Sequence, residues 1–222
     1  MMTKIRAIIT GATGMVGEGV LHECLHHADV EKVLVVGRKH SGVTHPKLEE
    51  IVHADFFDLA PIQDRLKGYN ACYFCLGVSS VGVKEEEYSR LTYGLTINFA
   101  KTVSELNPGL TFCYVSGAGT DSSQRGKSMW ARVKGKTEND LLKLPFKGAY
   151  MFRPGYMKPT KGLKYTLGFY FGSGFVYPIL KFILPGFSCT LKEVGTAMIN
   201  AAMYGYAKNI LEVRDIVELA KR

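Results

Sequence analysis

Long apolar runs are missing from this sequence of 222 residues, and so is the composition of a disordered chain. The longest charge-free stretch of its second half, Tyr165 to Leu180, is interrupted by glycines and a proline and is shorter than the roughly 18 apolar residues of a membrane-spanning helix. The apolar run near the start, Ala7 to Ile9, is too short for a secretory signal. Hydrophobic residues make up 46% and charged residues 22%, values typical of a folded protein. We therefore expect a folded cytoplasmic protein without a transmembrane segment.

Acidic residues are the scarcer charged class, with 20 Asp and Glu against 28 Lys and Arg, which gives a formal net charge of +8. A basic protein suits anionic partners such as a phosphorylated cofactor, a nucleic acid or an acidic membrane surface. The sequence lacks the basic helices and base-stacking motifs of known nucleic-acid modules. We therefore expect a small-molecule substrate and no nucleic acid, while the oligomeric state, including a homodimer, stays open.

Cysteines are few and odd in number. Five cysteines in a chain without an export signal are expected to be reduced thiols. Cys72 and Cys75 form a C-x-x-C pair inside an apolar run, but residues three apart on a strand face opposite sides of the sheet. A redox or zinc role for this pair is therefore not expected, and no metal site is predicted.

Apolar runs of strand length alternate with helical segments as far as about residue 153, which is the pattern of βαβ units. The predicted strands are Lys4 to Thr10, Lys32 to Gly37, Glu50 to His53, Ala71 to Leu76, Leu110 to Ser116 and Gly148 to Arg153. The pattern predicts an α/β fold with a doubly wound parallel sheet.

Several helices are marked by periodicity or by capping residues. The clearest covers 85–106, where apolar side chains recur at steps of three and four and are expected to face the core. They are Tyr88, Leu91, Leu95, Phe99, Val103 and Leu106. Thr190 and Glu193 have the spacing of a capping box and predict a helix to about Met203, and Asp215 is expected to cap a short final helix.

Three glycines follow the first predicted strand with the spacing G-x-x-G-x-x-G and precede a helix over 18–27. In such a turn the first glycine permits the tight bend, the second lets the backbone approach a pyrophosphate, and the third lets the helix pack close to the strand. The helix N-terminus then faces the negative charge. A purely structural turn is the alternative, but the strand and helix on either side favour dinucleotide binding. The contacts expected at this turn come from Gly11, Thr13, Gly14, Met15, Val16 and Gly17.

The end of the second predicted strand favours NADP over NAD. NAD sites place a carboxylate there against the ribose 2′-hydroxyl, whereas a 2′-phosphate needs a cation. This chain has Arg38 and Lys39 at that point and no carboxylate. A solvated pair of surface cations is the alternative interpretation. We expect Arg38 to contact the 2′-phosphate.

These motifs together resemble the short-chain dehydrogenase/reductase superfamily. The resemblance rests on GATGMVG, VGR, HADF, the glycine after the fourth strand and YVSG at the end of the fifth. Within the superfamily the chain is most similar to the small atypical NAD(P)-binding proteins of the epimerase/dehydratase branch that are related to the Tat-interacting reductase-like tumour suppressor. The resemblance implies a single Rossmann domain over 1–222. It further implies cofactor contacts from Asp55, Phe56, Leu76, Gly77, Pro154 and Gly155.

The catalytic residues of this chain differ from those of the superfamily at one position. The superfamily has a tyrosine four residues before a lysine on one helix face, where the lysine holds the ribose and the tyrosine passes a proton. Here Lys134 is present, but Trp130 replaces the tyrosine. An indole cannot act as an acid near neutral pH. Ser116 is the candidate for polarising a carbonyl, and the alternative is a serine that only forms a turn. Tyr156 is the candidate substitute phenol, and the alternative is a buried aromatic without a chemical role.

Two functions follow from this sequence. The first is an NADP(H)-dependent oxidoreductase that acts on a small carbonyl or sugar-like substrate. The second is a catalytically weak NADP(H)-dependent sensor or scaffold that binds a protein partner, which Trp130 favours. The segment 155–188, rich in aromatics and glycine, is expected to lie on the substrate side. It predicts an apolar substrate cover over 156–187, with a satellite core, a subunit contact or a membrane-surface patch as alternatives.

Overall fold

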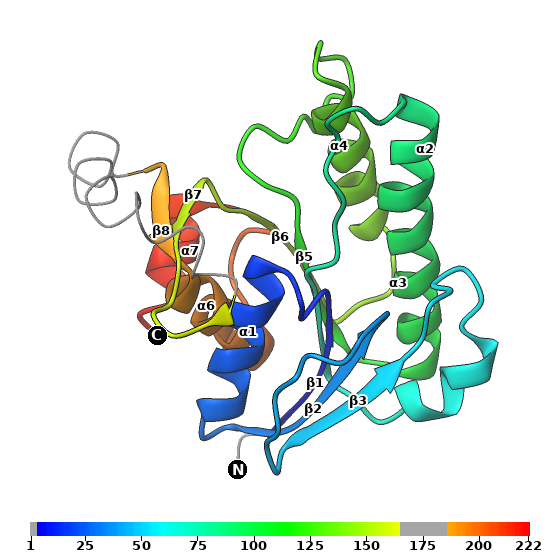
Figure 1. The fold of residues 1–222 in the computed structure, drawn as a ribbon. Helices are drawn as coiled ribbons and strands as arrows, with labels where there is room; N and C mark the ends of the chain where they lie inside the picture. Colours follow the sequence, from blue (N-terminus) through cyan, green and yellow to red (C-terminus); the bar gives the residue numbers. More distant parts are fainter. Residues whose placement is uncertain (1–3, 165–185) are drawn as a thin grey trace.

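The computed structural model describes residues 4–164 and 186–222, so most of the predicted substrate cover lies outside the described residues. Within the described part, seven strands form one parallel sheet in the order β3-β2-β1-β4-β5-β6-β9 (Figure 1). They are β1 (Ile5–Thr10), β2 (Val30–Gly37), β3 (Leu48–Val52), β4 (Ala71–Phe74), β5 (Thr111–Val115), β6 (Gly148–Arg153) and β9 (Ile210–Glu212). The six predicted strands are confirmed. The sequence did not predict β9, because a strand of three residues is too short to give a recognisable pattern.

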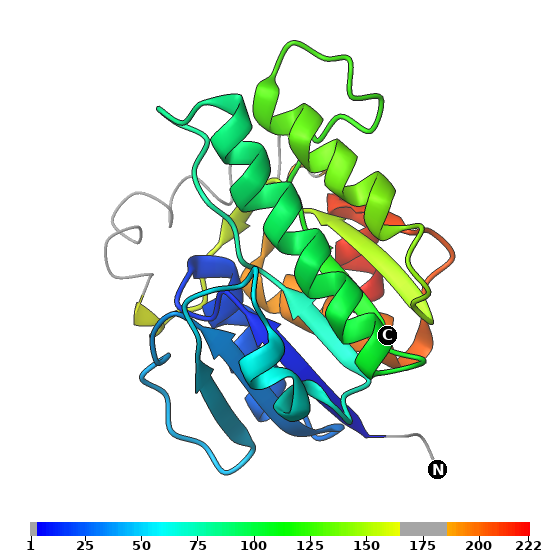
Figure 2. The same cartoon turned by 90° about the vertical axis from the view of Figure 1, so that its right-hand side faces the viewer.

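Helices cover both faces of this sheet, as Figures 1 and 2 show. One face carries α1 (Met15–His26), α6 (Leu191–Tyr204) and α7 (Val213–Leu219). The other carries the 3₁₀ helix η1 (Ala60–Leu66), the continuous helical run α2 (Glu85–Ser89), η2 (Arg90–Gly94) and α3 (Leu95–Leu106), and α4 (Met129–Leu141). Two short strands, β7 (Tyr156–Lys158) and β8 (Ser188–Thr190), pair in a separate small sheet. The predicted doubly wound α/β fold is therefore confirmed.

The strands are apolar on both sides because both faces of the sheet are covered. Ile8 and Ile9, neighbours in β1, are both fully buried, yet they belong to different halves of the core. Ile9 packs in the half beneath α1 and α6, and Ile8 packs in the half beneath α3. Cys72 and Cys75 divide between the same two halves, so their predicted placement on opposite faces is confirmed.

The helix ends follow their capping residues with one correction. The Thr190 hydroxyl accepts a hydrogen bond from the Glu193 backbone N–H at 3.0 Å, and the Glu193 carboxylate accepts one from the Thr190 N–H at 2.7 Å, as the capping box predicts. Asp215 does not occupy the capping position of α7. Glu212 does, and the Asp215 carboxylate accepts a hydrogen bond from its backbone N–H at 3.1 Å. A reciprocal pair thus replaces the single expected cap.

The cysteines are free thiols whose pKa values are raised above the ordinary range by burial. Residues 4–164 and 186–222 contain no group of three or more histidine, cysteine or acidic side chains arranged to hold a metal ion. None of the helices built from those same residues combines the length and apolar character that a bilayer crossing demands.

Candidate functional site

The glycine turn between β1 and α1 is shaped by two close backbone contacts. Gly11 has a φ of +71°, and a Cβ added to it would lie 2.7 Å from the backbone carbon of Cys75 at the end of β4. A Cβ on Gly17 would lie 2.1 Å from the Gly11 carbonyl oxygen. Neither position can hold a larger residue unless the turn moves. The helix that follows begins at Met15, and no side chain caps it at Gly14, so its first N–H groups are available to an anion.

Three hollows follow one another along the carboxyl ends of the strands. The turn hollow is lined by Gly11, Ala12, Thr13, Val35, Gly37, Arg38, Lys39 and Leu76. The Asp55 hollow is lined by Arg38, Ala54, Asp55, Phe56, Phe57, Leu76, Gly77, Val78, Arg90, Leu91 and Leu95. The Lys134 hollow is lined by Val78, Ser79, Ser80, Tyr88, Ser116, Gly117, Ala118, Trp130, Lys134, Pro154, Gly155 and Phe187. Since Arg38, Leu76 and Val78 are shared between neighbours, the three form one groove.

This groove fits a dinucleotide. It extends to both sides of the junction between β1 and β4, where the strand order reverses and open α/β sheets bind their ligands. The turn hollow and the Asp55 hollow lie on one side of this junction, and the Lys134 hollow lies on the other. Most residues predicted to contact the cofactor line it. Gly14, Met15, Val16 and Gly17 do not line the hollows and instead form the turn and the first turn of α1.

Arg38 and Lys39 are exposed at the turn hollow, and neither forms an ion pair with a described residue. Glu50 of β3 has other partners, because it accepts hydrogen bonds from the Ser41 N–H at 2.7 Å and from His40 at 2.9 Å. Burial alone would raise the pKa of Glu50, but these hydrogen bonds lower it. Both cations are thus left facing the hollow.

Lys134 and Trp130 line the same hollow from adjacent turns of α4. The Lys134 ammonium donates a hydrogen bond to the Ser116 carbonyl oxygen at 2.5 Å, which holds its side chain at the end of β5. Burial lowers the pKa of Lys134 to about 8, against a smaller raising effect of Glu138. Lys134 does not form the surface ion pair with Glu138 that its spacing allows.

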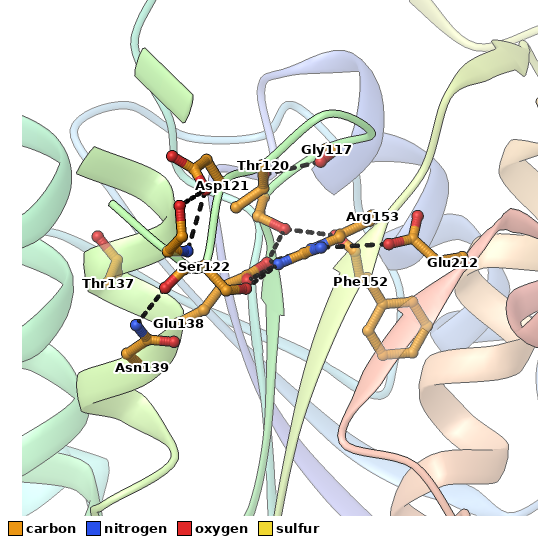
Figure 3. Close-up of polar contacts among 12 residues, drawn as sticks. Gly117, Thr120, Asp121, Ser122, Thr137, Glu138, Asn139, Phe152, Arg153 and Glu212 are labelled. Atoms are coloured by element: carbon orange, nitrogen blue, oxygen red, sulfur yellow. Dashed lines mark hydrogen bonds and ion pairs between the residues drawn. The ribbon is translucent and has the colours of Figure 1, made fainter. Parts of the chain in front are cut away.

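The Ser116 hydroxyl is directed into a buried polar cluster. It lies 2.5 Å from Glu138 Oε1 and 3.1 Å from the Phe152 carbonyl oxygen, two acceptors for its single proton. Glu138 is fully buried and also accepts hydrogen bonds from Arg153, as Figure 3 shows. Ser116 therefore lines the hollow, but its hydroxyl proton is already engaged by acceptors within the protein.

Tyr156 and Tyr88 differ in their position relative to the Lys134 hollow. Tyr156 lies in β7, and it is not among the described residues that line the Lys134 hollow, although its neighbours Pro154 and Gly155 are. Tyr88 lines that hollow while being 2% exposed. The periodicity of apolar residues correctly placed Tyr88 on a buried helix face. No local pattern in the sequence indicated that this face reaches the hollow. The π-helical segment η2 begins two residues after Tyr88, and such segments are frequent at functional sites.

Comparisons with known proteins agree with this geometry. A family model described as NAD dependent epimerase/dehydratase family matches residues 7–126. The chain is 31% identical over 156 residues to protein FMP52-2 of Scheffersomyces stipitis, which covers 68% of this chain and 66% of that protein, just under two thirds of its length. It is 26% identical over 235 residues to FMP52-1 of the same organism, which covers 97% and 99%.

Solved structures share the fold at low identity. The enzyme WbmG of Bordetella bronchiseptica, in complex with NAD and UDP, superposes with a TM-score of 0.67 at 12% identity and covers 98% of this chain and 77% of that one. The ADP-L-glycero-D-manno-heptose-6-epimerase of Helicobacter pylori gives 0.66 at 15%, with 99% and 81% covered. At such identities the likeness establishes the fold. The finer resemblance to the Tat-interacting reductase-like proteins stays a prediction.

The comparisons correct one expectation. Both FMP52 relatives are named as mitochondrial proteins, as are those of Meyerozyma guilliermondii and Candida glabrata. These names contradict the cytoplasmic location expected from the lack of an export signal. The error has a simple reason, since the absence of a secretory signal does not distinguish the cytoplasm from other compartments.

Proposed function

The chain belongs to the NAD dependent epimerase/dehydratase family, and from that premise we propose that it is an NADP(H)-binding oxidoreductase-like protein for a small carbonyl or sugar-like substrate. Family membership implies a nicotinamide cofactor. The single observation that carries the rest is the continuous groove that joins the glycine turn to the Lys134 hollow. The proposal includes one cofactor-binding domain over 1–222.

Each part of the groove has a role in this proposal. The glycine turn and the start of α1 would hold the pyrophosphate, and Arg38 with Lys39 would hold a 2′-phosphate. Asp55 and Phe56 would lie beside the adenine, and Lys134 would hold the second ribose. Leu76 and Gly77 would run along the cofactor between these ends.

The nicotinamide would supply or accept the hydride, and the chain would have to move a proton on the substrate oxygen. Trp130 cannot do this, because an indole does not titrate near neutral pH. Tyr156 is the donor expected from the sequence. Tyr88 is a stronger candidate than Tyr156, since it lines the Lys134 hollow. The Tyr88 phenol is protonated at neutral pH and could donate to an oxygen that gains negative charge, although burial raises its pKa and so makes it a weaker acid than an exposed tyrosine.

A catalytically weak sensor or scaffold is the second candidate function. The presence of Trp130 and the engagement of the Ser116 hydroxyl by Glu138 both favour it, because they take away two groups that usually act on the substrate oxygen. Cofactor binding would then stabilise a form of the protein that a partner recognises.

Cofactor preference tests the proposal without a known substrate. Isothermal titration of NADPH and NADH should show at least tenfold tighter binding of NADPH, because a charge-assisted hydrogen bond contributes roughly 1.5–3 kcal/mol. Arg38→Ala should remove most of this preference. Arg222→Ala, which removes a guanidinium that lines none of the three hollows, is the matched control. Equal affinities of the unmodified protein for both cofactors would refute the NADP assignment.

A further inference from the structure

A third cation reaches the loop that follows β2 from a distant part of the chain. The Lys164 ammonium lies against Gly42, where a Cβ would be only 2.6 Å from Nζ. The Lys164 backbone N–H donates a hydrogen bond to Glu18 Oε1 at 2.7 Å, and Glu18 is in the first turn of α1. Residues 159–164 thus lead from β7 to α1 and the loop after β2 (Figure 2).

The cationic groups at this place have no ion-pair partner among the described residues. Lys164, Arg38 and Lys39 are all exposed, and none of their charged groups forms an ion pair with another described residue. The Glu18 carboxylate is turned to the backbone of Lys164, and Glu50 is occupied by Ser41 and His40. A phosphate monoester that carries up to two negative charges would offer an ion-pair partner to cationic groups that have none within the protein.

We propose that Lys164 is a specificity-determining residue that contacts the phosphate on the adenosine ribose, together with Arg38 and Lys39. The inference deepens the proposed function and rests on it. The position follows from the fold, because the group that distinguishes NADP from NAD lies at the end of the second strand, and Lys164 contacts the loop that leaves this end. The sequence motif around Arg38 gives no hint of this contact.

The main effect of Lys164 should be on phosphate recognition and not on the rest of the cofactor. We expect Lys164→Gln to weaken NADPH binding about three- to tenfold, a moderate loss because the ammonium is exposed to solvent and screened by salt. NADH binding should change less than twofold. The loss should shrink when the ionic strength is raised from about 0.05 M to 0.5 M.

Matched variants separate a specific contact from a change in net charge. Lys161→Gln removes the same charge from the same exposed segment, and it should leave both affinities unchanged. Lys164→Arg should retain the NADPH preference. Because Lys164 is exposed, each variant should unfold at the temperature of the unmodified protein, which a thermal melt without cofactor checks.

The source of the phosphate is tested with fragments. 2′,5′-ADP should bind with the same dependence on Lys164 as NADPH, whereas 5′-AMP, which lacks the 2′-phosphate, should not depend on it. The inference is overturned while the proposed function stands if Arg38→Ala abolishes the NADPH preference and Lys164→Gln behaves like Lys161→Gln. It is also overturned if Lys164→Gln weakens NADPH and NADH equally. Equal binding of NADPH and NADH by the unmodified protein overturns both.

Discussion

Glu138 and Arg153 form a buried ion pair where α4 meets the end of β6 (Figure 3). Arg153 Nε donates to Glu138 Oε1 at 3.0 Å, and a second guanidinium nitrogen donates to the other carboxylate oxygen. The same guanidinium reaches the Ser122 hydroxyl at 2.5 Å and Glu212 at 3.2 Å. The pair therefore links α4, β6, β9 and the loop after β5, and it sets the direction of the Ser116 hydroxyl.

Removing the carboxylate of this pair should destabilise the fold. Among the described residues, Glu138→Gln leaves the Arg153 charge with the exposed Glu212 as its counter-charge, and breaking a buried pair typically costs about 3–5 kcal/mol. We expect the free energy of unfolding, measured by urea titration, to fall by about 3 kcal/mol. Asp64→Asn, which breaks an exposed pair with Lys67, should change it by less than about 1 kcal/mol. Equal effects of the two variants would contradict the structural importance of the buried pair.

The pKa of Lys134 predicts a rise of stability at alkaline pH. Burial lowers this pKa from 10.5 to about 8, so between these values the unfolded chain binds a proton that the folded chain has released. Stability must then increase with pH in this window. Relative to Lys134→Met, the unmodified protein should gain about 2 kcal/mol between pH 7 and pH 10, since one pKa unit corresponds to about 1.4 kcal/mol. Taking the difference from Lys134→Met cancels the ionisation of cysteines and tyrosines, and a difference that stays constant over this range would contradict the lowered pKa.

The proton donor can be identified by three tyrosine variants. With a panel of small aldehydes and NADPH, the unmodified protein should turn over slowly, because general acid catalysis usually contributes about 10²- to 10⁴-fold and Trp130 cannot provide it. Tyr88→Phe should lower kcat at least tenfold. Tyr93→Phe is the control, since its hydroxyl is engaged by Asp140 at 3.0 Å. A loss confined to Tyr156→Phe would return the role to the tyrosine expected from the sequence.

Trp130→Tyr tests the catalytic position itself. Lys134 lines the same hollow, so restoring the phenol four residues before it should raise kcat for the same aldehydes above that of the unmodified protein. NADPH affinity should change little, because the cofactor contacts are untouched. Unchanged turnover with intact NADPH binding would favour the sensor or scaffold function.

Two glycines of the turn should separate stability from cofactor binding. Gly17→Ala places a methyl group 2.1 Å from the Gly11 carbonyl oxygen, so it should lower the free energy of unfolding by about 2 kcal/mol or more. A Cβ on Gly14 meets nothing nearer than 3.4 Å. Gly14→Ala should therefore keep the stability and weaken cofactor binding at least fivefold, because its methyl group would hinder the approach of a pyrophosphate. Strong cofactor binding by Gly14→Ala would show that the pyrophosphate does not approach this residue.

The sequence by itself determined the elements and the turn. Strands such as Gly148–Arg153 are buried on both faces, so their apolar runs are continuous and easy to identify. The glycine turn could also be predicted from a short stretch of sequence, because Gly17 and Gly11, which approach each other closely, both belong to this turn. The Thr190 and Glu193 capping box also lies within four residues and was predicted correctly.

Only the tertiary structure decided which side chains meet in the groove. The Ser116 hydroxyl is bound by Glu138 of another element, and Tyr88 reaches the Lys134 hollow from a helix face whose periodicity indicates core. Lys164 meets Gly42 from a distant part of the chain. Such contacts depend on how helices dock and on where loops return. Periodicity and spacing report which face of an element is buried, but not which distant residue that face will meet.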